Sequence, residues 1–355
     1  MTTRELNRAT LARQLLLGRE KLGVADAVER LGGLQAQEAR PPFLALWSRI
    51  EGFERDDLRA ALHKGQVVRA MLMRATLHVV SAKQYAALRP VLDDVMTRAM
   101  TGALKGRDQG LDLAKVLPAA EKLLAKSPRT FNELRAELSE KFPKVNERAL
   151  GYAVRTQLPL AMVPSDDDWA FPRDAEFALA KVRLRKPDPK ALVLAYLAAF
   201  GPATAADVQR WSGMQGIKPV LEGMREQLVT FEAGKRELFD LPDAPRPDAD
   251  VEAPPRFLPD FDSLVLAHDD RTRVIADKHK PKIASKNLRI PAMVLWDGFA
   301  TGTWRIERKR GVATVAMKPF GKLPAGAKKG LEPEALALAA FADPEAKDYA
   351  FTVER

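Results

Sequence analysis

Two glutamines one residue apart are the first candidates for chemistry in this sequence. They lie in Gln35-Ala36-Gln37, between the pairs Gly32-Gly33 and Pro41-Pro42, which predict a helix end and a helix start. If this segment is extended, both amide side chains point the same way. Each amide offers an acceptor and two donor hydrogens, enough to hold a water molecule in one orientation. Two glutamines in a loop are also a common solvated feature, so chemistry and a plain surface loop both stay open.

Three further polar residues alternate along a predicted strand. Arg74, Thr76 and His78 are separated by single apolar residues, and period two places all three on one face. A guanidinium, a hydroxyl and an imidazole on one face suit contact with a DNA phosphate or a substrate. The alternative is a hydrogen-bonded patch that anchors the hairpin, and for His78 this alternative is favoured.

Several other kinds of chemistry have no support in the sequence. The chain has no cysteine, which excludes disulfides and thiolate catalysis. No GxSxG, Walker A or GxGxxG motif occurs. No two histidines have the spacing of zinc ligands; they are His63, His78, His268 and His279. We therefore expect no metal site and no cofactor.

The elements predicted around the glutamines form an N-terminal unit, residues 1–105. Apolar periodicity and stop signals predict several helices, then a strand pair, then an exit helix. The helices are expected at 7–21, 24–31, 41–51 and 57–64, the strand pair at 66–80 and the exit helix at 82–100. Helices followed by a hairpin are the order of a winged helix with an added helix.

Two later units repeat this order. In each, a small residue and a proline end one helix and a threonine, Thr130 or Thr204, caps the next. Residues 106–185 have predicted helices at 113–126, 131–142 and 147–158 and strands at 160–163 and 168–171. Residues 186–240 have predicted helices at 189–200, 205–211 and 218–228 and strands at 229–232 and 236–240. We predict a mainly α fold with β wings, built from three tandem winged-helix units, which commonly place a helix in the DNA major groove.

A proline-rich, acidic linker at residues 241–260 is predicted to lead into a C-terminal domain, residues 261–355. Short alternating segments predict strands at 263–267, 291–296, 302–307 and 312–319. A turn is expected at Asp297-Gly298 and a closing helix at 333–342. This pattern predicts a small β-barrel-like domain.

The positive charge of the chain is concentrated in this C-terminal domain. The whole chain has a net charge of +10, and residues 278–329 hold 13 basic and two acidic residues, a net +11. Such a patch favours a polyanion such as nucleic acid, with a solvated basic face as the alternative. The residues predicted to contact phosphates are Lys278, Lys280, Lys282, Lys286, Arg308, Lys309 and Arg310.

One hairpin of the basic domain adds a further candidate. Gly302 precedes Trp304 and Arg305, and glycine gives the chain freedom to present side chains at a hairpin tip. A tryptophan in a strand is usually buried, so Trp304 is predicted in the core. We predict that Arg305 contacts DNA, since its guanidinium fork suits phosphate.

The bulk properties limit the class of protein. A hydrophobic fraction of 46% and a charged fraction of 29% are typical of a soluble globular protein. The sequence has no apolar run of membrane-spanning length, and its N-terminus lacks the apolar core of a signal peptide. We therefore expect a cytoplasmic protein with no membrane contact and no obligatory protein partner.

Five segments, taken in order, resemble the AlkZ-like family of winged-helix DNA glycosylases. They are LGGLQAQ, MRATLH, AFGPAT, PRFLPDFD and DGFATGTWR, and the resemblance runs from about residue 7 to residue 341. The family's catalytic signature is Gln-x-Gln in one branch and Gln-x-Asp in its sister branch. Gln35-Ala36-Gln37 matches the first form, so the resemblance implies that Gln35 and Gln37 are catalytic.

The resemblance also implies a fold and an activity. The fold would be three winged helices and a small β-barrel that form a C-shaped clamp. The activity would be excision of N7-alkylguanines, including bulky adducts and interstrand crosslinks, from double-stranded DNA without a metal or cofactor. Two alternatives stay open: a transcriptional regulator, which would bind one duplex sequence preferentially, and a non-catalytic DNA-binding protein.

Overall fold

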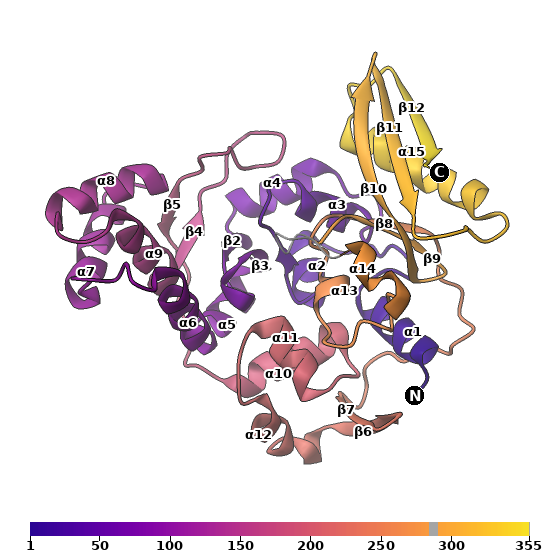
Figure 1. Cartoon of the computed structure of the whole chain (residues 1–355), viewed down its shortest axis with the longest axis horizontal. Coiled ribbons are helices and arrows are strands. Elements are labelled where there is room, and N and C mark those ends of the chain that lie inside the picture. Colours follow the sequence, from indigo (N-terminus) through magenta and orange to yellow (C-terminus); the bar gives the residue numbers. More distant parts are fainter. Residues whose placement is uncertain (284–289, 355) are drawn as a thin grey trace.

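The first helix of the chain is shorter than its apolar pattern predicts. The computed structural model, shown in Figure 1, describes residues 1–283 and 290–354. α1 (Thr3–Arg13) starts at a capping box between Thr2 and Glu5. It ends at Arg13, not at residue 21, because Leu15 adopts a left-handed φ of 56° that no helix continues through.

The N-terminal unit builds a small sheet against three helices. The helices are α2 (Val24–Arg30), α3 (Pro41–Trp47) and α4 (Arg55–His63), and the strands are β1 (Leu34–Gln35), β2 (Val67–Met71) and β3 (Leu77–Ser81). β1 pairs with β3, which pairs with β2. Leu34 and Val79 face each other across β1 and β3 and are buried in one core with Val28 and Leu58 of the helices. Burial of one sheet face therefore fixes the register.

The predicted exit helix is two helices, α5 (Ala82–Val91) and α6 (Asp93–Leu104). The break falls at Leu92, whose φ and ψ are −97° and 8°. Pro90, two residues earlier, has no amide hydrogen to donate within the helix. A continuous helix over residues 82–100 was therefore a wrong prediction.

The order of elements recurs in the next two units. The second unit has α7 (Leu113–Leu124), α8 (Phe131–Lys141), α9 (Glu147–Gln157), β4 (Leu160–Met162) and β5 (Phe177–Leu179). The third unit has α10 (Pro189–Phe200), α11 (Ala205–Ser212), α12 (Ile217–Glu222), β6 (Val229–Ala233) and β7 (Arg236–Asp240). The predicted caps are confirmed, since Thr130 and Thr204 each form a capping box. In both units a single bridge from the residues before the second helix, Arg129 to Phe177 and Ala203 to Phe239, takes the place of β1.

One predicted strand of the second unit is wrong. Residues 168–171 are a loop, and the second strand of the hairpin is β5. Ala170 has a left-handed φ of 62°, and Trp169 packs edge-on against Phe43 of α3 with ring centroids 5.3 Å apart. The aromatic residues of this loop, Trp169 and Phe171, pack against the first unit.

The first two units share one sheet. Ala70 of β2 pairs with Ala161 of β4, which gives a five-stranded order β1-β3-β2-β4-β5. β6 and β7 form a separate two-stranded hairpin near the N-terminus of the chain (Figure 1). The first two units are therefore joined by backbone hydrogen bonds.

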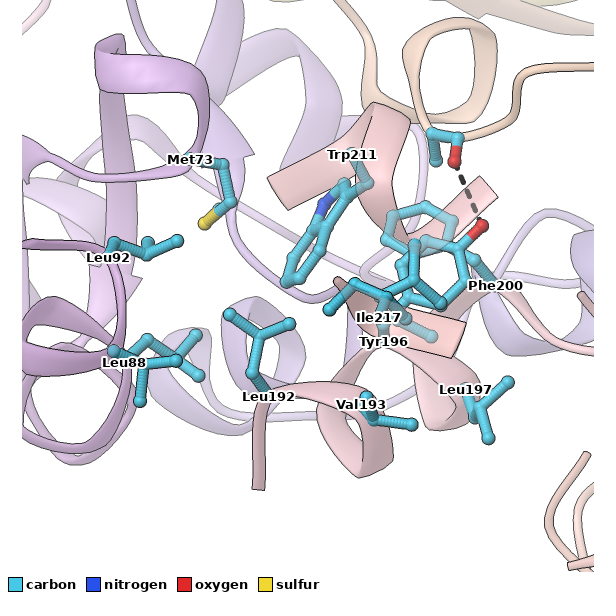
Figure 2. Close-up of a cluster of buried hydrophobic side chains, with 14 of the residues drawn as sticks. Met73, Leu88, Leu92, Leu192, Val193, Tyr196, Leu197, Phe200, Trp211 and Ile217 are labelled. Atoms are coloured by element: carbon cyan, nitrogen blue, oxygen red, sulfur yellow. Dashed lines mark hydrogen bonds between the residues drawn. The ribbon is translucent and has the colours of Figure 1, made fainter. Parts of the chain in front are cut away.

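A large apolar core joins the first unit to the third. Figure 2 shows Met73, Leu88 and Leu92 of the first unit beside Leu192, Tyr196 and Trp211 of the third. The Tyr196 hydroxyl donates to the carbonyl of Ala267 at 2.8 Å, which links this core to the C-terminal part of the chain. This packing places the turn between β2 and β3 against α11.

The C-terminal part forms a five-stranded sheet around one helix. The sheet contains β8 (Arg256–Leu258), β9 (Met293–Trp296), β10 (Phe299–Lys309), β11 (Val312–Pro319) and β12 (Asp348–Val353), in the order β12-β11-β10-β9-β8. α15 (Ala327–Ala342) packs its apolar face against this sheet. The order has two edges, so within the described residues the strands do not close into the predicted barrel.

The sequence pattern misplaced three elements of this part. The predicted strand at 263–267 is the short helix α13 (Ser263–Leu266), because the Asp262 carboxylate caps it. β8 lies inside the predicted linker, whose backbone carbonyls at Ala249 and Val251 accept bonds from Arg4 and Arg8. β12 was not predicted. The turn at Asp297-Gly298 is confirmed, with φ of 48° and 78° in a two-residue hairpin loop.

Buried ion pairs tie these parts to α1 and α3. Arg13 binds both carboxylate oxygens of Asp240 at 2.7 Å, and the two side chains are 1% and 0% exposed. Arg49 binds Asp262 in the same two-point manner, at 3.0 and 2.9 Å. No helix in the described part of the chain is long and apolar enough to cross a membrane.

We expect Asp240→Ala to lower the free energy of unfolding by about 3–5 kcal/mol, because it leaves the Arg13 guanidinium buried without its carboxylate. Denaturant unfolding followed by circular dichroism measures this loss. Glu237→Ala, on the same strand, is the matched control: its ion pair with Arg225 is exposed, and no resolvable loss is expected. Equal stability of the two variants would contradict this role of the buried pair.

Candidate active site

The glutamine pair lies at the end of a short strand. Gly32 and Gly33 have φ of 70° and 86°, so the chain leaves α2 by a turn that favours glycine. A Cβ on Gly33 would lie 2.7 Å from a methyl carbon of Val80, so the strand approaches β3 too closely for any other residue. Gln35 then pairs with His78 across β1 and β3.

The side chain of Gln35 is held by an arginine. Its Oε1 accepts a hydrogen bond from Nη2 of Arg74 at 2.6 Å, and Gln35 is 9% exposed. Arg74 also donates through Nη1 to the carbonyl of Trp211 on α11. Arg74 has a left-handed φ of 54° in the turn between β2 and β3, which directs its side chain across to α11. One guanidinium thus connects the first glutamine to the third unit.

Gln37 is exposed, and its side chain adds one hydrogen bond to β3 beyond the end of β1. Its Oε1 accepts the backbone N–H of Leu77 at 3.2 Å. Its own carbonyl accepts a bond from Arg69 at 3.3 Å, and the carbonyl of Ala36 accepts one from the same guanidinium at 2.9 Å. Arg69 is buried over the ring of Phe171, 4.7 Å from its centroid. The backbone and both side chains of the motif are therefore fixed.

These contacts determine which way each amide faces. Arg74 and the backbone N–H of Leu77 can only donate, so the atom that meets each of them must be the amide oxygen. Both Nε2 groups then keep their hydrogens for another acceptor, and each Oε1 keeps a second lone pair. The pair can bind a small polar molecule with donors and acceptors together.

His78 is buried under the strand surface, so its imidazole is not presented for the predicted contact with DNA. It is 1% exposed, and its Nδ1 bonds to the carbonyl of Thr76 at 2.9 Å. Burial lowers the pKa of His78 to about 3, and the charge of Arg74 adds to this shift. His78 is thus a neutral imidazole that supports the strand under Gln35, as the anchoring alternative expects.

The predicted alternation of three side chains on one face is also wrong. Arg74 lies in a turn, not in β3, so period two does not apply to it. The Thr76 hydroxyl donates to the carbonyl of Met73 at 3.0 Å and closes this turn. The pKa of Arg74 is lowered to about 10. Burial is the largest cause, and the positive charges of Arg210 and Arg271 lower it further. The structure brings Arg74 to the glutamines and keeps Thr76 and His78 in supporting contacts.

Three of the predicted phosphate contacts lie on α14 (Lys280–Ile283) or just before it: Lys278, Lys280 and Lys282. Lys280 pairs with Asp277 at 2.6 Å, and Lys282 donates to the carbonyl of Phe320. Lys278 is exposed. Lys286 lies outside the described residues.

The other predicted contacts lie at the far end of β10. Arg308, Lys309 and Arg310 surround the turn between β10 and β11. β10 has 11 residues, so this turn lies about 33 Å along the strand from the hairpin at Asp297. Arg308 pairs with Asp343 at 3.2 Å. Among the predicted phosphate contacts, those at α14 and those at this turn therefore lie in separate parts of the domain.

Arg305 lies in the middle of β10 and not at a hairpin tip as predicted. It is exposed and pairs with Glu307 and Glu354 on the sheet surface. Trp304 is buried at 8% exposure, as expected, and its ring N–H donates to the carbonyl of Leu258 at 2.8 Å. The β10–β11 pairing continues past Gly302, which explains why this glycine marks no tip.

Two contributors to the site were missed by the sequence reasoning. Arg69 and Trp211 hold the motif through backbone carbonyls, and such contacts leave no residue pattern. A buried arginine in the middle of an apolar strand is the one available signal, and Arg69 shows it between Val68 and Ala70. Among the described residues no cluster of three or more acidic or histidine side chains is placed to hold a metal ion.

The low pKa of His78 makes stability depend on pH. The unfolded chain protonates His78 near 6.5, so below this pH it takes up a proton that the folded chain refuses until about pH 3. The contribution of neutral His78 to the free energy of unfolding is therefore fully present above pH 6.5, and it decreases as the pH is lowered further. Between pH 7.5 and 5.0, His78→Asn should lose about 2 kcal/mol less than the unsubstituted protein in urea unfolding. Identical pH dependence of the two proteins would mean that folded His78 accepts protons readily.

Comparisons with known proteins agree on one family. A family model described as DNA glycosylase AlkZ-like matches residues 28–341. An interstrand DNA cross-link repair glycosylase of Streptomyces sahachiroi is 24% identical, over 93% of this chain and 93% of that protein. The solved structure of the Streptomyces sahachiroi DNA glycosylase AlkZ superposes with a TM-score of 0.82 at 20% identity, covering 99% of this chain and 100% of that one. The family match covers Gln35, Gln37 and the residues that hold them, and the chain belongs to the AlkZ-like family of DNA glycosylases.

Proposed function

We propose that this chain is a monofunctional DNA glycosylase that hydrolyses the N-glycosidic bond of N7-alkylated guanine in duplex DNA. The observation that carries the proposal is the pair of oriented amides, Gln35 and Gln37, in a chain of the AlkZ-like family. Bulky adducts are included among the substrates. The relative named for interstrand cross-link repair supports crosslinks as a further substrate.

The reaction asks for little acid or base. Alkylation at N7 makes the guanine cationic, so the bond between C1′ and N9 breaks with its electron pair passing to the base, which leaves neutral. Water forms the new bond to C1′ and releases a proton to solvent. Glutamine does not titrate near neutral pH, so it is neither a general acid nor a general base. A base that is already cationic can leave without either. Normal purines, which leave poorly, should not be substrates.

The two amides position the water. One Nε2 hydrogen donates to the water oxygen and the free lone pair of the other Oε1 accepts a water hydrogen, so that a water lone pair is left for C1′. Holding a nucleophile in this way can supply several kcal/mol of the barrier. The amide dipoles also face the positive charge that develops on the sugar. The rigid hold by Arg74 and the Leu77 N–H means that little reorganisation is needed at the moment of reaction.

The remaining parts of the chain bind the duplex in this proposal. The three recurring helix-and-hairpin units act as winged helices and, with the C-terminal sheet, form a C-shaped clamp around DNA. Of the predicted phosphate contacts that the structure describes, Lys278, Lys309 and Arg310 are exposed and have no ion pair, so they are the ones most available to phosphates. Neither a membrane nor a protein partner is required, and the expected compartment is the cytoplasm.

The test is single-turnover excision from a duplex that holds one N7-methylguanine, with abasic sites revealed by alkali and heat. Gln35→Ala and Gln37→Ala should each slow excision at least about tenfold, because water is no longer held. Gln227→Ala removes an exposed glutamine of the third unit and is the matched control, with an unchanged rate. Melting temperatures of Gln37→Ala and Gln227→Ala should stay close to that of the unsubstituted protein, whereas Gln35→Ala should melt at a lower temperature because Nη2 of Arg74 loses its acceptor. Rates are compared at a temperature at which all variants are folded. Full activity of both motif variants would remove the glutamines from the mechanism.

A further inference from the structure

Three arginines from three parts of the chain lie near enough for their charges to interact, and one of them, Arg74, binds Gln35. Arg74 comes from the first unit and bonds to the carbonyl of Trp211. Arg210 precedes Trp211 on α11, in the third unit. Arg271 follows α13, where the backbone N–H of Asp269 donates to Asp207, one turn before Arg210, at 2.8 Å. The packing of α11 on the turn between β2 and β3 therefore brings the three residues near one another, and the charges of Arg210 and Arg271 act on Arg74.

The carboxylates near this cluster are engaged elsewhere or act on it only through their charge. Asp207 accepts hydrogen bonds from Thr204 and from the Asp269 backbone. Its carboxylate also interacts electrostatically with His268 and Arg273. Within the described residues neither Arg210 nor Arg271 has a salt bridge or a hydrogen bond from its guanidinium, although the charge of Asp269 favours the protonated form of Arg271. Arg271 is half-buried, and burial, followed by the charge of Arg210, lowers its pKa.

Such an arrangement is unfavourable in the free protein. Like charges repel at short range, and a half-buried guanidinium without a partner has lost part of its hydration. A solvated surface arginine would turn away from its neighbours, whereas Arg74 is held in place by Gln35 and Trp211. An anion placed among the three groups would remove the repulsion and accept forked hydrogen bonds.

We propose that Arg74, Arg210 and Arg271 form a binding site for one backbone phosphate of duplex DNA next to the glutamine pair. Arg210 and Arg271 supply the direct contacts, and Arg74, whose Nη1 and Nη2 each already donate one bond, supplies charge. A phosphate here would set the distance from the DNA backbone to Gln35. Only the choice of DNA as the polyanion rests on the proposed function.

The experiment measures binding of an undamaged duplex, by fluorescence anisotropy, over a range of salt concentrations. Arg210→Gln and Arg271→Gln should each reduce the slope of log affinity against log salt by about 1, and the double variant by about 2. Affinity of the double variant should fall at least about tenfold at moderate salt. Arg107→Gln, at an exposed arginine after α6, is the matched control and should change neither quantity.

A second measurement separates this site from the proposed chemistry. Saturating protein with N7-methylguanine duplex should restore excision by the double variant to within about threefold of the unsubstituted rate, whereas Gln35→Ala should stay slow with an unchanged salt slope. Reduced slopes without excision by any protein would keep the phosphate site and reject the glycosylase. Unchanged slopes would overturn the site even if excision is normal. Stabilisation by inorganic phosphate with unchanged slopes would assign the cluster to a free anion and would also overturn the proposal.

Discussion

A buried guanidinium group must find acceptors for its hydrogens, and the architecture of this chain depends on that constraint. Arg13 reaches Asp240 from α1, and Arg49 reaches Asp262 from the turn after α3. Arg273 donates to the carbonyl of Pro202 at 3.0 Å. Each bond joins segments far apart in the sequence. Because an unpaired charge in the core costs several kcal/mol, these parts cannot separate without losing stability.

The same constraint shapes the candidate active site. Arg69 satisfies the carbonyls of Ala36 and Gln37, and Arg74 satisfies Gln35 and the carbonyl of Trp211. Buried arginines therefore hold the neutral glutamines in place by donating hydrogen bonds to them and to their backbone. A reaction that starts from a cationic base needs no strong acid or base, and a site made rigid in this way suits the placement of water.

The distribution of positive charge on the surface depends on where the lysine and arginine side chains lie in the fold, and not on how many the sequence contains. Residues 278–329 carry a large positive charge, yet the basic residues among them that the structure describes are spread over α14, β10, β11, α15 and the segments between them. Arg305 and Arg308 are partly neutralised by carboxylates from α15 and the C-terminal strand region. The proposed phosphate site draws instead on Arg210 and Arg271, which lie outside that segment.

The sequence by itself determined the local elements and the motif. Apolar periodicity, threonine caps and glycine pairs predicted most helices, including α10 to the residue, because these signals act within one turn of chain. The family resemblance singled out Gln35 and Gln37. Only the tertiary structure decided that residues 168–171 form a loop, that β12 completes the sheet, and that Arg74 leaves the strand face while His78 is buried in it. Those outcomes depend on burial and hydrogen bonds between segments distant in the sequence, such as Trp169 on Phe43 and Arg74 on Trp211, and no pattern within one segment contains them.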